Sequence, residues 1–261
     1  MKNIIYFLCA VAALASCSSS YNIQGTSDVQ NLDGHMLYIR AQKGKEVKNI
    51  DSCDVVHGQF AFRGNIDTVK VGALVINDES IMPIVLEEGE ISIKFNKAKR
   101  TCTGTPLNDK LNDFIEKYNQ LENQILDLSR QEAQAYMNGN DMKEVYNRLQ
   151  KQSIELNAEQ EDFITKFIEE NFDNILGSFV FQMATASMEI PMTNSWIDAL
   201  MVKATDNFKN DPYVKEFLDA AAHNQAIMTG MENPTPAVPE ETTEAAPPTP
   251  NEMANPESKK D

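Results

Sequence analysis

The chain has 261 residues, and a hydrophobic fraction of 42% is enough to build a substantial core, while the length fits two domains of ordinary size. The formal net charge of -16 argues against binding to nucleic acid, because no basic face could compete with that negative field. The acidity is uneven: residues 22–105 carry 10 cationic and 11 anionic side chains, residues 106–231 carry 10 and 21, and residues 232–261 carry 2 and 7. The acidic character therefore belongs to the second half and the tail.

The amino terminus has the pattern of a bacterial lipoprotein signal. Lys2 precedes an apolar run that is too short to span a bilayer, and the run ends in Leu14-Ala15-Ser16-Cys17. We interpret residues 1–16 as a signal peptide, Cys17 as the lipidation site and residues 17–21 as a tether; the alternative is a plain secretory signal with an incidental cysteine. Acyl chains on Cys17 would hold the protein to a membrane without a spanning helix. No acidic cluster follows Cys17, which favours an outer-membrane position facing the periplasm.

Short runs of alternating apolar residues occupy residues 22–105 and predict an antiparallel β-sandwich or an open barrel. Turn signals separate them at Asp33-Gly34, Lys43-Gly44, Asn77-Asp78 and Glu88-Gly89. The segment Ile50 to Ile66 predicts a β-hairpin that turns at Gly58, with Val55, Phe60 and Phe62 on one buried face. Pro83 fits an edge strand or a bulge.

Several motifs in this region resemble one known family. They are Ile23-x-Gly25, Ile50-Asp51-Ser52, Gly58-x-Phe60-x-Phe62-x-Gly64, Leu86-Glu87-x-Gly89 and Gly104-Thr105-x-x-Asn108. This pattern resembles domain of unknown function 4369 (DUF4369) over about residues 22–115. The resemblance implies a place at the front of thiol–disulfide interchange lipoproteins, ahead of a helical segment and a thioredoxin-like domain. It assigns no catalytic residue, and this chain contains no Cys-x-x-Cys pair.

Residues 106–231 predict an α-helical domain, so the expected fold class is α+β. Thr105 is the expected N-cap of a long first helix, with Pro106 at its first position. Apolar residues at alternating spacings of four and three form its inner seam: Leu107, Leu111, Phe114, Tyr118, Leu121, Ile125 and Leu128. The break at Asn138-Gly139-Asn140 predicts a helical hairpin, and the second helix has its own inward-facing residues: Met142, Val145, Leu149, Leu156, Phe163 and Phe167.

Three shorter helices are expected beyond the hairpin, at residues 175–188, at residues 193–204 with Trp196, and from Pro212, which follows the cap residue Asp211. The stripe of the last helix is formed by Val214, Phe217, Leu218 and Ala221. The tail at residues 232–261 is rich in Pro, Glu and Thr, and we expect it to be disordered.

Few residues suggest a catalytic, redox or metal-binding role. Cys53 and Cys102 are the only cysteines outside the signal segment and the lipidation site; the compartment permits a disulfide between them, but two unpaired buried residues are the simpler reading. Cys53, His57 and Asp51 share strand parity, which would suit a cysteine–histidine nucleophile or part of a zinc site, but His35 is the only other histidine in this half and a capped strand end explains them better. The acidic residues Glu161, Asp162, Glu169 and Glu170 are typical of a solvated helix face.

We therefore expect a non-catalytic, membrane-anchored lipoprotein that binds an envelope protein or a small ligand, without a metal or other cofactor. The alternative is an accessory to periplasmic thiol–disulfide exchange or cytochrome biogenesis, acting through Cys53 and Cys102 or by docking a separate thioredoxin-like protein. A third hypothesis is an assembly or stress factor that uses the cleft between the two domains.

Overall fold

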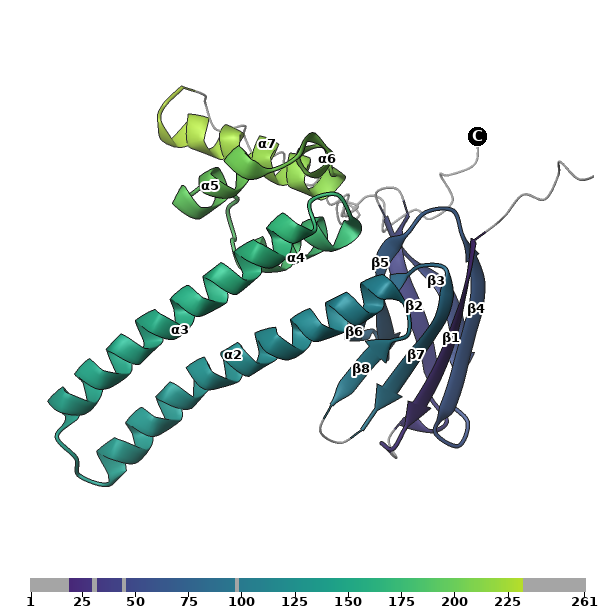
Figure 1. The fold of residues 1–261 in the computed structure, drawn as a ribbon, viewed down its shortest axis with the longest axis horizontal. Helices are drawn as coiled ribbons and strands as arrows, with labels where there is room; N and C mark the ends of the chain where they lie inside the picture. The colour runs from purple at the N-terminus through teal and green to yellow at the C-terminus, as the bar shows by residue number, and fades with distance from the viewer. Residues whose placement is uncertain (1–18, 30–31, 44–45, 97–98, 232–261) are drawn as a thin grey trace, which may run out of the picture.

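The structure is a computed structural model that describes residues 19–29, 32–43, 46–96 and 99–231. The predicted signal peptide, the lipidation site Cys17 and the C-terminal tail lie outside the described residues. The predicted tether at residues 17–21 is too long, because Ser19, Ser20 and Tyr21 already belong to the first strand and pair with residues 64–66. Within the described residues, two four-stranded sheets come first and a helical region follows, which confirms the predicted α+β class (Figure 1).

The two sheets face each other as a sandwich. One has the order β4 (Gln59–Ile66), β1 (Ser19–Ser27), β7 (Gly89–Phe95), β8 (Arg100–Thr103); the other has the order β3 (Glu46–Asp54), β2 (Met36–Lys43), β5 (Lys70–Ile76), β6 (Glu79–Leu86). Neighbouring strands are antiparallel except β1 and β7, which run parallel. Pro83 lies on β6, an edge strand, as predicted.

Alternate residues of the strands fill the space between the sheets, because successive side chains of a strand point to opposite faces. The most buried of them come from both sheets: Ile23, Leu37, Ile39, Leu74, Ile84, Leu86, Ile91 and Ile93. Gly25 leaves room for an aromatic ring, since a Cβ at this position would lie 2.1 Å from the ring of Phe60. The motif glycine therefore serves core packing.

The predicted hairpin at Ile50 to Ile66 is wrong. β3 pairs with β2 and β4 pairs with β1, so the chain crosses here from one sheet to the other. His57 and Gly58 turn the chain with φ of 52° and 69°. Val55, Phe60 and Phe62 do belong to one core, as predicted. The alternation of apolar residues shows which face of a strand is buried. It does not show whether two such strands are hydrogen-bonded in one sheet or face each other across a sandwich. β1 and β8 were not predicted as strands.

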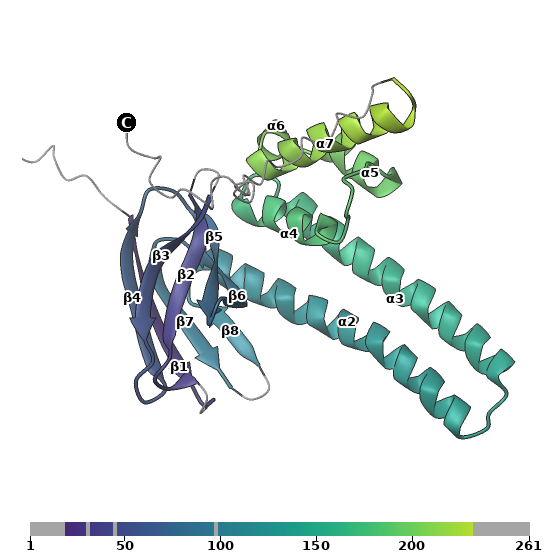
Figure 2. The same cartoon turned by 180° about the vertical axis from the view of Figure 1, so that it is seen from behind.

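Two long helices, α2 (Pro106–Met137) and α3 (Met142–Glu170), form the predicted hairpin. Gly139 makes the turn with φ of 70°, and Asp141 caps α3 by accepting a hydrogen bond from the backbone N–H of Lys143. The hairpin leaves the sandwich at the start of α2 and extends away from the sheets in both views (Figures 1 and 2).

Four shorter helices gather around the open end of the hairpin, near the sandwich (Figure 2). They are α4 (Ile175–Thr185), α5 (Ser195–Lys203), α6 (Asp206–Lys209) and α7 (Pro212–Met228); α6 was not predicted. A second core joins them to the bases of α2 and α3, and aromatic side chains dominate it: Phe114, Phe167, Phe172, Phe181, Phe208 and Phe217. Among the described helices, none combines the length and the apolar character needed to cross a bilayer.

Candidate binding groove between the sandwich and the hairpin

The base of α2 is fixed to the sandwich by one buried carboxamide, that of Asn108, which is 1% exposed. Its Oδ1 accepts from the backbone N–H of Val85 at 2.9 Å, and its Nδ2 donates to the carbonyl of the same residue at 2.8 Å. Nδ2 also donates to Thr105 Oγ1 at 2.8 Å, and Oδ1 accepts from the thiol of Cys102 at 3.1 Å. The carboxamide therefore pairs with both backbone groups of one β6 residue, as the opposite residue of a neighbouring antiparallel strand would.

The buried carboxylate of Glu87 caps the same helix from outside it. Its Oε1 accepts from the backbone N–H groups of Leu107 and Asn108 at 2.9 and 3.0 Å. Thr105 occupies the N-cap position, as predicted, but its side chain makes no capping hydrogen bond. A negative charge at a helix N-terminus is favourable because it pairs with free N–H groups and with the helix dipole. The cap therefore comes from a residue that is distant in sequence.

These contacts close the outer edge of β6. The N–H and carbonyl of Val85 are paired with Asn108, Pro83 has no N–H to offer, and the carbonyl of Ile81 accepts from Arg100 at 2.9 Å. An edge strand with its polar groups occupied cannot take up another strand easily. A partner that approaches this edge must therefore be bound by side chains.

A groove of about 2210 Å³ lies between this edge and the hairpin. Its walls are the start of β6, the β7–β8 turn, one side of α2 and the middle of α3. Six carboxylates and three cations line it: Glu79, Glu116, Glu122, Asp127, Glu155 and Glu159, with Lys99, Arg100 and Arg130. Lys99 pairs with Glu116 at 2.6 Å, and Arg100 donates to the backbone of β6. Glu159 and Glu155 pair with Lys117 and Lys151, which do not line the groove. The lining still has more carboxylates than cations.

Asparagines follow the wall formed by α2. Asn112, Asn119 and Asn123 lie four, eleven and fifteen residues after Asn108, and all of them line the groove. These spacings place side chains on one face of a helix. Unlike Asn108, the three carboxamides make no side-chain hydrogen bond to any described residue. These asparagines were not predicted as site residues, although their spacings of four, seven and four residues, counted from Asn108, can be read from the sequence.

The cysteine–histidine site that was weighed against a capped strand end is not assembled. The Asp51 carboxylate accepts from the hydroxyl of Tyr21 at 3.1 Å, and His57 is exposed in the turn after β3. Burial and the carboxylates of Asp51 and Asp54, opposed by a hydrogen bond from the Ala61 backbone, raise the pKa of Cys53 to about 11. His, Cys, Asp and Glu residues within the described ranges form no group of three suited to a metal ion. The arrangement of Asp51, Cys53 and His57 is that of a strand end and the turn that follows it.

Cys53 and Cys102 are both free thiols. Cys53 is on β3 against the backbone of Ala61 in β4, whereas Cys102 is on β8 against Asn108. β3 and β8 are end strands, and they lie on opposite sides of the sandwich because β8 faces β6. Burial, with the nearby charges of Asp109 and Glu87, raises the pKa of Cys102 to about 12. Neither thiol is set up as a nucleophile at neutral pH.

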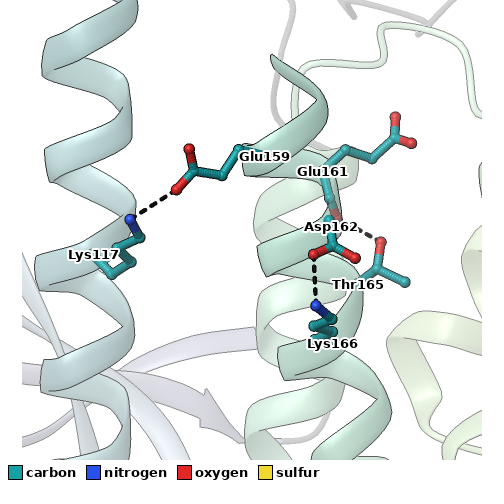
Figure 3. A network of polar contacts seen from close by, with 6 residues as sticks. All are labelled: Lys117, Glu159, Glu161, Asp162, Thr165 and Lys166. Carbon is teal, nitrogen blue, oxygen red and sulfur yellow. Dashed lines mark hydrogen bonds and ion pairs between the residues drawn. The ribbon is translucent and has the colours of Figure 1, made fainter. Parts of the chain in front are cut away.

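The acidic residues of α3 form ion pairs and a solvated face (Figure 3). Glu159 pairs with Lys117 of α2 at 2.9 Å, and Asp162 pairs with Lys166 one turn along at 2.8 Å. The hydroxyl of Thr165 donates to the backbone carbonyl of Glu161 at 2.6 Å. Glu169 pairs with Lys203 of α5 at 2.7 Å. Glu159 and Glu169 therefore connect α3 to other helices, Asp162 pairs within α3, and these carboxylates do not converge on a common point.

A β-sandwich whose last strand leads into a helix capped by the sandwich defines the architecture of residues 19–137. Comparison with known families assigns the first part of it: residues 21–111 match the model of a domain of unknown function, DUF4369. The match ends just after Asn108, so it contains the whole junction with α2, and the resemblance stated from the motifs is confirmed for this region. A search of curated proteins found no match.

Proposed function

We propose that this protein is a non-catalytic lipoprotein of the cell envelope that binds an envelope protein or a small ligand in the groove between its sandwich and its hairpin. The observation that carries the proposal is the groove of about 2210 Å³, whose wall presents carboxamides without partners among the described residues. Broad concave sites with a few polar groups are the usual places for ligand binding.

The proposed anchor agrees with this use of the groove. Two peptide bonds separate Cys17 from Ser19, the first residue of β1, so acyl chains on Cys17 would keep that end of the strand close to a bilayer. The hairpin extends away from that end in both views (Figures 1 and 2). We infer that the groove would be accessible from the periplasm while the protein stays on the outer membrane.

The anchor is tested by replacing Cys17 with serine in the producing cell. We expect the variant to lose metabolic labelling with an alkynyl fatty acid and to leave the membrane fraction. A variant that keeps its label and its membrane partition would refute lipidation at this cysteine.

The groove is tested by placing a benzophenone amino acid at Asn119 and, as a control, at Asn147, an exposed residue of α3 that does not line the groove. Irradiation of intact cells should give a discrete adduct only from position 119. The adduct should disappear when Asn112 and Asn123 are both changed to lysine. Equal capture from both positions, or turnover of thiol, ester or glycoside substrates by the purified protein, would contradict the proposal.

A second candidate is docking of a separate thioredoxin-like protein, which is what the motif resemblance to thiol–disulfide interchange lipoproteins implies; the matched family model itself is described only as a domain of unknown function. The raised pKa values of Cys53 and Cys102 favour docking over exchange by these thiols themselves. Alkylation of periplasmic samples with and without reductant distinguishes docking of a thioredoxin-like protein from thiol exchange by Cys53 and Cys102. We expect replacement of both cysteines by alanine to leave the redox state of envelope thiols unchanged; a change would restore the intrinsic redox role.

A further inference from the structure

The groove already contains one example of how its carboxamides can bind. Asn108 contacts both the N–H and the carbonyl of Val85, at 2.9 and 2.8 Å, and so binds the backbone of one residue of an extended chain rather than a side chain. A primary carboxamide is planar, and it has two N–H donors and one oxygen acceptor for such a pairing. This pairing needs no particular sequence in the strand that is bound.

The same group is repeated along the wall of α2. Asn112 is half-buried, Asn119 and Asn123 are exposed, and none of them has a side-chain hydrogen bond to a described residue. Positions four residues apart on a helix are separated by about 6 Å along its axis. Two residues of an extended chain span about 6.7 Å. The spacing from Asn119 to Asn123 therefore matches the repeat of an extended polypeptide.

Charge decides what kind of polypeptide would fit. The groove is lined by six carboxylates and three cations. Glu116, Glu155 and Glu159 are in ion pairs with lysines, which leaves Glu79, Glu122 and Asp127 outside any ion pair among the described residues, against Arg100 and Arg130. An acidic segment would be repelled, whereas lysine and arginine side chains would find carboxylates on both walls. Because the outer edge of β6 is closed by Asn108, Pro83 and Arg100, the segment would bind to the helix side of the groove.

We propose that the groove binds an extended, positively charged peptide segment of a partner protein, with Asn112, Asn119 and Asn123 hydrogen-bonding its backbone as Asn108 hydrogen-bonds Val85. The inference rests on the proposed function of the groove and gives its ligand a chemical class. Side chains of the segment contribute through charge, so recognition tolerates different sequences of the same charge.

The test uses the detergent-solubilised full-length protein and fluorescein-labelled ten-residue peptides, one set rich in lysine and threonine and a matched set rich in glutamate and threonine. Fluorescence anisotropy should show at least tenfold tighter binding of the cationic set. The best cationic peptide is then made with alternate backbone nitrogens methylated, which keeps its side chains and charge but removes N–H donors. We expect methylation to weaken binding at least tenfold.

The variant N112L/N119L/N123L should lose a similar factor and should no longer distinguish the methylated peptide, while N147L should bind as the unchanged protein does. Circular dichroism and the unfolding midpoint check that the triple variant is folded. Equal affinity for both charge sets, indifference to methylation, or displacement of the peptide by a neutral oligosaccharide such as maltoheptaose would overturn the inference. If no peptide binds while the benzophenone at position 119 still gives its adduct, the groove function stands and the peptide assignment falls.

Discussion

The two halves of α2 differ in what supports them, although they belong to one continuous helix. Residues 106–121 include four buried positions and pack against both the sandwich and the aromatic core, whereas residues 122–137 include one, Ala135, and rely on α3. The outer part of the hairpin has a core of only three buried residues, Ala135, Val145 and Leu149. Buried contacts set local stability, so we expect a firm base and an outer end that opens more readily.

The asparagines show the same contrast in another way. At the base, Asn108 is buried and fully engaged; one turn later Asn112 is half-buried and has no partner among the described residues. The same side chain therefore serves structure where a strand edge is in reach and has no partner among the described residues where it is not. This difference can be tested by identical substitutions at the two positions.

Asn108→Leu is expected to have the largest effect. It leaves the N–H and the carbonyl of Val85 without their buried partner, and unsatisfied groups of this kind cost about 1–3 kcal/mol each. We expect the free energy of unfolding, measured by urea denaturation, to fall by about 3–5 kcal/mol. The matched control, Asn112→Leu, should change it by less than about 0.5 kcal/mol. Similar losses for both variants would remove the distinction between base and groove.

Glu87→Ala should destabilise the protein by about 1–3 kcal/mol, because two buried N–H groups of the first turn lose their acceptor. Glu87→Gln keeps an oxygen in place and should cost less than half as much. The neighbouring Glu88 is exposed and bonds only to Ser19 Oγ at 3.1 Å, so Glu88→Ala serves as the control. Equal stability of the Glu87 and Glu88 variants in urea would show that the helix needs no cap from the sandwich.

Leu149→Ala addresses the outer half of the hairpin. Removing a large core side chain usually lowers the free energy of unfolding by about 2–5 kcal/mol. Here the loss is limited, because it cannot exceed the free energy needed to unfold the outer segment of the hairpin by itself. We expect a loss of about 1–2 kcal/mol in global stability. Hydrogen exchange should show lost protection in residues 122–150 and retained protection in residues 106–121. Leu111→Ala at the base should instead lower protection along the whole hairpin.

The parts of this architecture that follow from local pattern were predictable, and the parts that depend on distant contacts were not. Short local patterns were enough to predict the break at Gly139, the apolar seams of α2 and α3, and the start of α7 at Asp211–Pro212. The partner of β3 depends instead on which sheet each strand joins, and the cap of α2 comes from Glu87, some twenty residues earlier. The groove depends on the angle at which Asn108 fixes α2 to the sandwich, and no periodicity encodes that angle.

Lys117→Ala should have the smallest effect. Its ion pair with Glu159 is the contact drawn in Figure 3 that joins the two helices, but the two side chains are 39% and 53% exposed. Water screens such pairs, and their net contribution is about 0–0.5 kcal/mol. A double-mutant cycle with Glu159→Ala measures the coupling in urea. Lys117 lies in the base half of α2, so a coupling above about 1 kcal/mol would mean that the firm base depends on charge as well as on its buried contacts, and the contrast with the outer half could then not be attributed to packing alone.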